Sequence, residues 1–141
     1  MTRPLAYITG NFGDSISKSV VNAISICRLI YLAGYSPICP FLRNYYILDL
    51  ENPEEVREGR EMANELLRRS RIVIVCGDTR EENVSADIAL AKHLNKPITT
   101  ADAIIELEEI LSEICDKKRE VVACKKKLRT KRSTLQYPRL S

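Results

Sequence analysis

The run Ile72-Val73-Ile74-Val75-Cys76 decides the fold. Its side chains are all apolar, and its isoleucines and valines are β-branched, which favours a strand whose two faces are both buried. Gly77-Asp78-Thr79 then ends the run. Such a strand is typical of the centre of a parallel sheet that has helices on both sides.

Strand and helix patterns alternate on either side of this run. We expect strands at residues 5–9, 36–40, 72–76 and 97–99, helices at about residues 16–33, 53–69 and 83–94 and from 101 onward, and a loop at residues 43–51. Strand followed by helix, four times over and with right-handed crossovers, predicts an α/β fold with a doubly wound parallel sheet of about four strands.

Two helix starts carry strong local signals. Asn52 precedes Pro53 and two glutamates, which gives the helix a capping side chain, a proline in its first turn and acids near the positive end of its dipole. Thr100 is the expected cap of the last helix.

The formal net charge of +3 is a cancellation between two unequal parts. Residues 117–141 hold ten of the 22 lysines and arginines against one acid, Glu120, and carry +9. Residues 1–116 hold 12 bases and 18 acids and carry −6. We therefore expect an α/β domain over residues 1–116 and a basic C-terminal extension over residues 117–141.

Composition excludes several classes of protein. No apolar run approaches the roughly 20 residues that cross a bilayer, so no membrane partner is expected, and the N-terminus lacks the features of a secretory signal. The five cysteines include no pair at metal-ligand spacing and are accompanied by one histidine. We therefore expect reduced, mostly buried thiols, no metal site and a cytoplasmic protein.

The loops at the carboxyl ends of the strands are where ligands bind in open parallel sheets. The first such loop is rich in glycines and polar side chains and contains Gly10, Asn11, Phe12, Gly13, Ser15, Ser17 and Lys18. Its backbone N–H groups can cradle an anion; the alternative is an ordinary glycine turn with Ser17 as a helix cap. The loop matches neither the Rossmann nor the P-loop motif, so no cofactor is expected.

Two carboxylates flank the loop after the central strand. Asp78 follows the strand directly, and Asp87 lies in the first turns of the next helix. Two carboxylates in one cleft can divide the roles of acid and nucleophile. The alternative is that Asp78 starts a turn and Asp87 only favours a helix N-terminus.

A set of short motifs occurs in one order over about residues 5–105. It consists of Tyr7-Ile8-Thr9-Gly10, Asn22, Pro37-Ile38-Cys39-Pro40-Phe41-Leu42, Glu61-Met62, Leu66-Leu67, Gly77-Asp78, Asp87-Ile88, Ala91 and Lys96-Pro97-Ile98. Together these motifs resemble the small nucleoside 2-deoxyribosyltransferase-like domains, including their uncharacterised phage and bacterial relatives. The resemblance implies a flavodoxin-like sheet, a homo-oligomer, and transfer or hydrolysis at the N-glycosidic bond of a deoxynucleoside or deoxynucleotide.

The resemblance also implies roles for individual side chains. Characterised members attack the anomeric carbon with a carboxylate on the helix after the third strand. The matching positions are Asp87 as nucleophile, Tyr7 as its orienting partner and Asp78 as the contact to the base. Phe41 and the loop from Gly10 to Lys18 are then expected to bind the substrate.

Four positions depart from the pattern of that family. Asp87 is one methylene shorter than the family's glutamate, Asn83 replaces a common glycine, Phe12 replaces a tyrosine and Phe41 replaces a frequent histidine. Because a small displacement of a nucleophile greatly lowers the reaction rate, these departures support a second hypothesis. It is a catalytically inactive nucleotide-binding or nucleic-acid-associated module.

The last helix changes character along its length. Its stripe of Ile104, Leu107, Leu111 and Ile114 continues into Lys118, Val121 and Lys125, and we expect the helix to project to about Lys127. The nine bases from Lys117 to Arg132 are a candidate site for nucleic-acid phosphates or for the acidic body of a neighbouring subunit. The alternative is a solvated terminus.

Overall fold

The computed structural model describes residues 2–136 of the 141-residue chain, and its contacts divide the chain into two units, residues 1–105 and 106–141. The elements in chain order are β1 (Leu5–Gly10), α1 (Ile16–Leu32), β2 (Ser36–Ile38), α2 (Pro40–Ile47), α3 (Pro53–Arg69), β3 (Ile72–Cys76), α4 (Glu82–His93), β4 (Ile98–Thr100) and α5 (Ala101–Gln136). The division at residue 116 rests on charge and stays a prediction.

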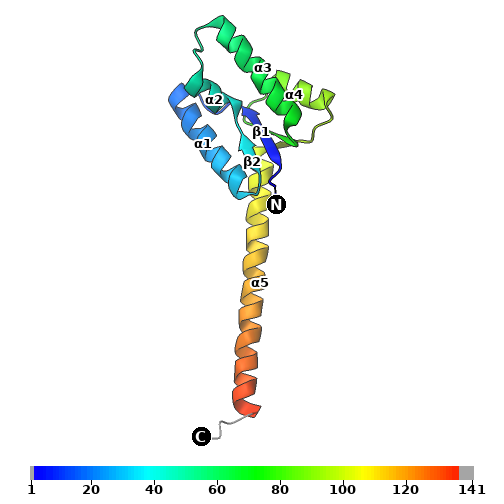
Figure 1. The fold of residues 1–141 in the computed structure, drawn as a ribbon. Helices are drawn as coiled ribbons and strands as arrows, with labels where there is room; N and C mark the ends of the chain where they lie inside the picture. Colours follow the sequence, from blue (N-terminus) through cyan, green and yellow to red (C-terminus); the bar gives the residue numbers. More distant parts are fainter. Residues whose placement is uncertain (1, 137–141) are drawn as a thin grey trace. The chain divides into compact units, whose positions relative to one another are not determined.

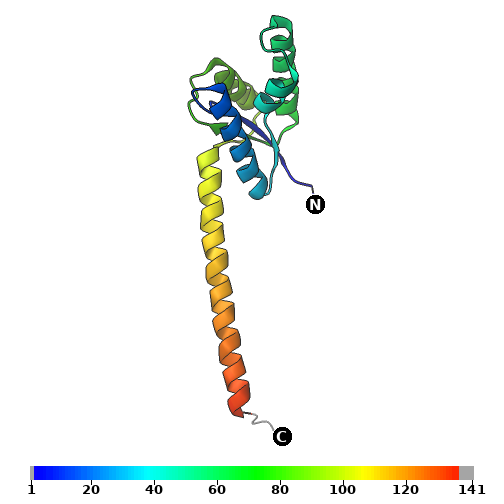
Figure 2. The same cartoon turned by 90° about the vertical axis from the view of Figure 1, so that its left-hand side faces the viewer.

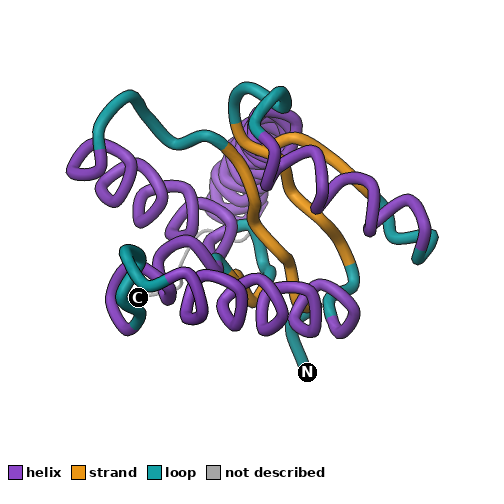
Figure 3. Tube along the Cα trace, turned by 90° about the horizontal axis from the view of Figure 1, so that it is seen from above, coloured by secondary structure: helices purple, strands orange, loops and turns teal. Residues whose placement is uncertain are grey.

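The four strands form one parallel sheet in the order β2-β1-β3-β4. This arrangement confirms the α/β fold with a doubly wound parallel sheet. The chain passes from β1 outward to β2 and then returns to place β3 on the other side of β1, so the direction of winding reverses between β1 and β3. Figure 3 shows the strands in orange with helices in purple on both sides of them.

Each face of the sheet has its own apolar core, because side chains alternate along a strand. On one face, Ile8 and Ile74 pack with Ile30 of α1 and with the first turn of α5. On the other face, Tyr7, Val73 and Val75 pack with Leu67 of α3 and Val84 of α4. Figure 1 shows β1 between α1 on one side and α3 and α4 on the other.

The two predicted helix starts are confirmed. Asn52 Oδ1 accepts a hydrogen bond from the N–H of Glu54 at 3.0 Å, and Thr100 Oγ1 accepts one from the N–H of Ala103 at 3.1 Å. The suggested Ser17 cap is wrong. Helix α1 begins at Ile16, and Ser15 is its cap, with its hydroxyl accepting from the N–H of Lys18 at 3.4 Å.

Two segments differ from the expectation. Strand β2 ends at Ile38, whereas a strand was predicted to reach Pro40, and residues 40–47 form α2, whereas a loop was predicted from residue 43. Pro40 occupies the first turn of α2, where its fixed backbone angle suits a helix and its missing N–H costs nothing. Helix α5 continues to Gln136 rather than ending near Lys127, and Figures 1 and 2 show it as one helix. Within residues 2–136, no helix is long and apolar enough to span a membrane.

Candidate active site

Asp87 is a buried carboxylate on α4, 3% exposed. Tyr7 Oη donates a hydrogen bond to its Oδ1 at 3.2 Å, and Thr9 Oγ1 donates one to its Oδ2 at 2.6 Å. Tyr7 and Thr9 are two residues apart on β1, so the same face of the strand supplies both donors. The structure thus brings together the side chains predicted as nucleophile and orienting partner.

Arg60 of α3 supplies the positive charge beside this carboxylate. Its Nη2 donates to Asp87 Oδ1, forming an ion pair between α3 and α4. Asn64, one turn further along α3, accepts from Arg60 Nε at 3.1 Å and from Nη2 at 2.8 Å, which fixes the guanidinium. A buried carboxylate is costly unless it is paired and hydrogen-bonded, and Arg60 meets that requirement together with Tyr7 and Thr9.

Tyr7 is the neutral partner in this cluster. Burial raises the pKa of its hydroxyl, and the negative charge of Asp87 raises it further against a smaller lowering by Arg60. The phenol therefore keeps its proton over the physiological range, and its O–H donates a hydrogen bond to Asp87 Oδ1.

A cavity of about 700 Å³ lies next to the cluster. Its walls come from β1 and the loop after it, from α2 and the segment that follows, from α3 and from the start of α4. The predicted site residues that line it are Tyr7, Gly10, Asn11, Phe12, Gly13, Phe41 and Asp87. Pockets of this size bind drug-sized molecules, and this one lies at the carboxyl ends of the strands, beside the reversal between β1 and β3.

Two aromatic rings form an apolar part of the wall. The ring centroids of Phe12 and Phe41 are 5.3 Å apart at an interplanar angle of 34°. Asn22 of α1 holds the backbone at Phe12 in place, because its Nδ2 donates a hydrogen bond to the Phe12 carbonyl at 2.6 Å. The two phenylalanines present an apolar surface of the kind on which a planar base stacks.

The ends of β1 and β3 approach each other so closely that glycine is required. A Cβ on Gly10 would lie 2.1 Å from the carbonyl oxygen of Cys76. Gly77 follows with φ of 68°, in the left-handed region, and a Cβ there would lie 2.6 Å from the carbonyl oxygen of Asn11. Glycines are therefore required at the two points where the loops after β1 and β3 leave the sheet.

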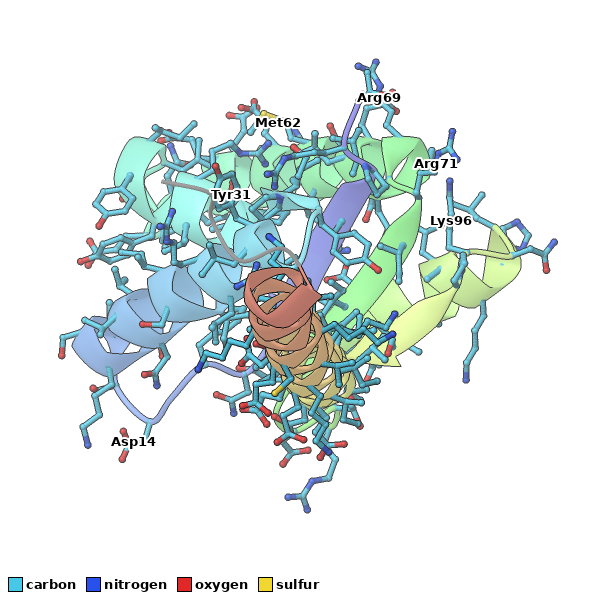
Figure 4. All side chains as sticks on the ribbon, turned by 90° about the horizontal axis from the view of Figure 1, so that it is seen from below. Asp14, Tyr31, Met62, Arg69, Arg71 and Lys96 are labelled. Atoms are coloured by element: carbon cyan, nitrogen blue, oxygen red, sulfur yellow. The ribbon has the colours of Figure 1, made fainter. Side chains whose placement is uncertain are left out.

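Four predicted site residues do not line the cavity, namely Asp78, Ser15, Ser17 and Lys18. Asp78 accepts from Arg80 Nη2 at 2.7 Å, and this guanidinium lowers the pKa of the Asp78 carboxyl. Lys18 pairs with Asp14 at 3.4 Å, and Figure 4 shows Asp14 pointing outward from its loop. The same view shows Arg69, Arg71 and Lys96 projecting from a different part of the domain.

Sequence reasoning missed Thr9, Arg60 and Asn64 as members of the site. Thr9 carried a usable signal, because it is two residues from Tyr7 on a strand and so shares its face. Arg60 lies between Gly59 and Ala63 on the buried side of α3, but nothing local in the sequence points to its partner 27 residues away. Within residues 2–127, no group of three or more potential metal ligands is present.

A family model described as a domain of unknown function, DUF7768, matches residues 4–101. The chain belongs to the DUF7768 family. The matched residues include all four strands and the side chains around Asp87. None of the curated proteins matches this DUF7768 chain significantly.

Among solved structures, the DUF7768 chain is similar to a 2-deoxyribosyltransferase from the psychrotolerant bacterium Bacillus psychrosaccharolyticus. The TM-score is 0.54 at 14% identity, over 68% of this chain and 70% of that one. At this identity the similarity is one of fold. The predicted resemblance to the deoxyribosyltransferase-like domains is thereby confirmed for the fold.

Proposed function

We propose that the chain binds a deoxynucleoside or deoxynucleotide in this cavity and cleaves or transfers its N-glycosidic bond. The observation that carries the proposal is the Asp87 carboxylate, which is buried, lines the cavity and accepts a hydrogen bond from the neutral Tyr7 hydroxyl. Such a carboxylate can stabilise an oxocarbenium-like centre and form a covalent bond to the sugar.

The hydrogen bonds of Asp87 favour Oδ2 as the attacking atom. Each carboxylate oxygen offers about two lone-pair sites. Among the residues that the structure describes, Oδ1 accepts from both Tyr7 and Arg60, whereas Oδ2 accepts only from Thr9, so Oδ2 keeps a lone pair for the substrate.

In the first step, Oδ2 bonds to C1′ of the sugar as the C1′–N bond breaks, and the base leaves with the bonding electrons and takes up a proton from solvent water. In the second step, water or another base attacks C1′, and the bond to Oδ2 breaks to restore the carboxylate. The proton that the attacking molecule loses passes to solvent water. Tyr7 and Arg60 hold Oδ1 throughout and stabilise the carboxylate as it departs.

The walls of the cavity fit the other parts of such a substrate. The rings of Phe12 and Phe41 are suited to the base, and the loop from Gly10 to Gly13 is suited to the sugar. The contact between Asp78 and the base stays a prediction, and it requires the Asp78 carboxylate to exchange Arg80 for the substrate.

One observation favours the second candidate, binding without catalysis. Arg60 pairs with the carboxylate that would attack, and an ion-paired carboxylate is a weaker nucleophile than a free one. In that case the cavity would bind the same class of ligand, and the ligand would leave unchanged.

Incubation with a panel of deoxynucleosides and their monophosphates, followed by chromatography for free base, tests the proposal. We expect release by the wild type and a loss of roughly a thousandfold or more in Asp87→Asn. Asp102→Asn, the same change at an exposed aspartate outside the cavity, is the matched control. Binding of a panel member without release would favour the second candidate, and neither binding nor release would contradict both.

A further inference from the structure

Helix α5 carries an apolar stripe along the second unit. Leu107, Leu111, Ile114 and Val121 are 55%, 52%, 44% and 53% exposed. Their spacing is that of the a and d positions of a heptad. Lys118 occupies the a position between Ile114 and Val121, and Lys125 occupies the next a position after Val121. A stripe of this kind on an exposed helix is typical of a surface that packs against another helix.

The charges of the same helix divide into two equal and opposite halves. Residues 106–116 hold five acids and no base, for a charge of −5, and residues 117–127 hold six bases and one acid, for a charge of +5. Interaction with the helix dipole favours acids at the start of a helix and bases at its end, but only within the terminal turns. The helix dipole therefore does not explain a separation of charge that extends over eleven residues in each half.

We propose that α5 pairs with α5 of a second copy of the chain in an antiparallel coiled coil centred near Asp116. Antiparallel pairing sets the acidic half of each helix beside the basic half of the other. Parallel pairing would set like charges side by side over the whole length, which is unfavourable.

The charges select the centre, and the apolar stripe is compatible with it. When Leu111 lies opposite Val121 of the second copy, Ile114 lies opposite Lys118 of the second copy, so that every a position faces a d position. The aliphatic stem of a lysine can cover an apolar neighbour while its ammonium group stays in water. The register that the charge pattern favours therefore also satisfies the a and d pattern.

Two exposed cysteines report on that register. With 1.5 Å of rise per residue, the two copies of Cys115 lie about 3 Å apart along the axis and the two copies of Cys124 lie about 24 Å apart. In a parallel, in-register pair, both cysteines would lie level with their counterparts. A thiol cross-linker therefore distinguishes the two orientations.

The first test measures mass in solution by light scattering on the full chain. We expect twice the 16.0 kDa of the single chain, and weaker association at high salt because the charges attract. Leu111→Glu should raise the dissociation constant roughly a hundredfold, whereas Ser112→Glu, which adds the same charge outside the stripe, should leave it nearly unchanged. Both positions are exposed, so the fold of the first unit does not depend on them.

The second test uses a bismaleimide whose reach is about one helix diameter, ~10 Å. Cys124→Ser, which keeps Cys115, should cross-link into dimers; Cys115→Ser, which keeps Cys124, should not; and the double variant sets the background. Equal cross-linking through both cysteines would overturn the antiparallel arrangement. A chain that is monomeric at every concentration, or whose association is unaffected by Leu111→Glu, would overturn the pairing itself, as would a monomer whose α5 binds DNA.

Discussion

The guanidinium of Arg60 and the carboxylate of Asp87 form an ion pair that joins α3 to α4 beside the cavity. Asn64 fixes the arginine from its own helix, and Tyr7 and Thr9 fix the aspartate from the strand. The carboxylate is therefore positioned by three elements at once. Such a fixed side chain is what a nucleophile needs, because misplacement of a reacting atom costs rate.

Loss of Arg60 should destabilise the domain. Arg60→Met leaves the buried Asp87 without its positive partner and should lower the free energy of unfolding by about 2 kcal/mol, less than for a fully buried pair because Arg60 is 29% exposed. Arg57→Met is the matched control on the same helix, because its side chain is 66% exposed and pairs with Glu54 near the surface. Urea unfolding measures both changes, and equal effects would contradict the importance of the pair.

Loss of the Tyr7 hydroxyl should slow catalysis more than it affects binding. Tyr7→Phe removes one hydrogen bond to a charged oxygen, worth roughly 1.5–3 kcal/mol, which corresponds to roughly a 10- to 150-fold fall in kcat. Tyr46→Phe, at an exposed tyrosine outside the cavity lining, is the control. Steady-state base release measures the change. A rise in KM at constant kcat would show that Tyr7 binds substrate rather than orienting Asp87.

Substitution of Gly10 should disturb the sheet at the floor of the site. A Cβ would meet the backbone oxygen of Cys76 at 2.1 Å, and neither strand can move without breaking its ladder, so Gly10→Ala should cost about 3 kcal/mol of stability. Gly13→Ala, whose Cβ would find its nearest atoms at 3.3 Å, should cost less than about 1 kcal/mol. Thermal unfolding of the two variants gives the comparison, and equal midpoints would contradict the close approach.

Alkaline pH should weaken the fold through Cys76. Burial raises the pKa of this thiol from its ordinary 9.0 to about 12. A group whose pKa is higher in the folded state contributes stability that is present below pH 9 and is lost as the pH rises toward 12, because the unfolded chain releases the proton first. The free energy of unfolding should fall less steeply with pH in this window in Cys76→Ala than in the wild type. Cys124→Ala, which removes an exposed thiol, is the control, and its free energy of unfolding should fall as steeply as that of the wild type.

The sequence could predict those parts of the molecule that local chemistry determines. The buried run Ile72–Cys76 and the caps Asn52 and Thr100 each depend on a few neighbouring residues, and each is where the pattern predicts it. Tyr7 and Asp87 were paired through the family resemblance rather than through any local signal. Their hydrogen bond depends on β1 and α4 meeting across the sheet face.

The features that sequence reasoning missed depend on contacts between distant segments. Arg60 becomes part of the site only because α3 packs beside α4. Residues 43–47 of helix α2 were expected to lie in a loop, and the contacts of α2 with α1 and α3 stabilise the helix. Asp78 was assigned by position after the strand, but Arg80 two residues later determines how its carboxylate is paired.

The covalent state of Asp87 during turnover distinguishes a nucleophilic carboxylate from one that only binds the substrate. Wild-type protein is quenched in acid while it releases base, then digested, and the peptides are analysed by mass spectrometry. We expect a deoxyribosyl ester on the peptide that contains Asp87, and its absence in Asp87→Asn. Base release by the wild type without this adduct, and at the same rate in Asp87→Asn, would show that Asp87 is not the nucleophile.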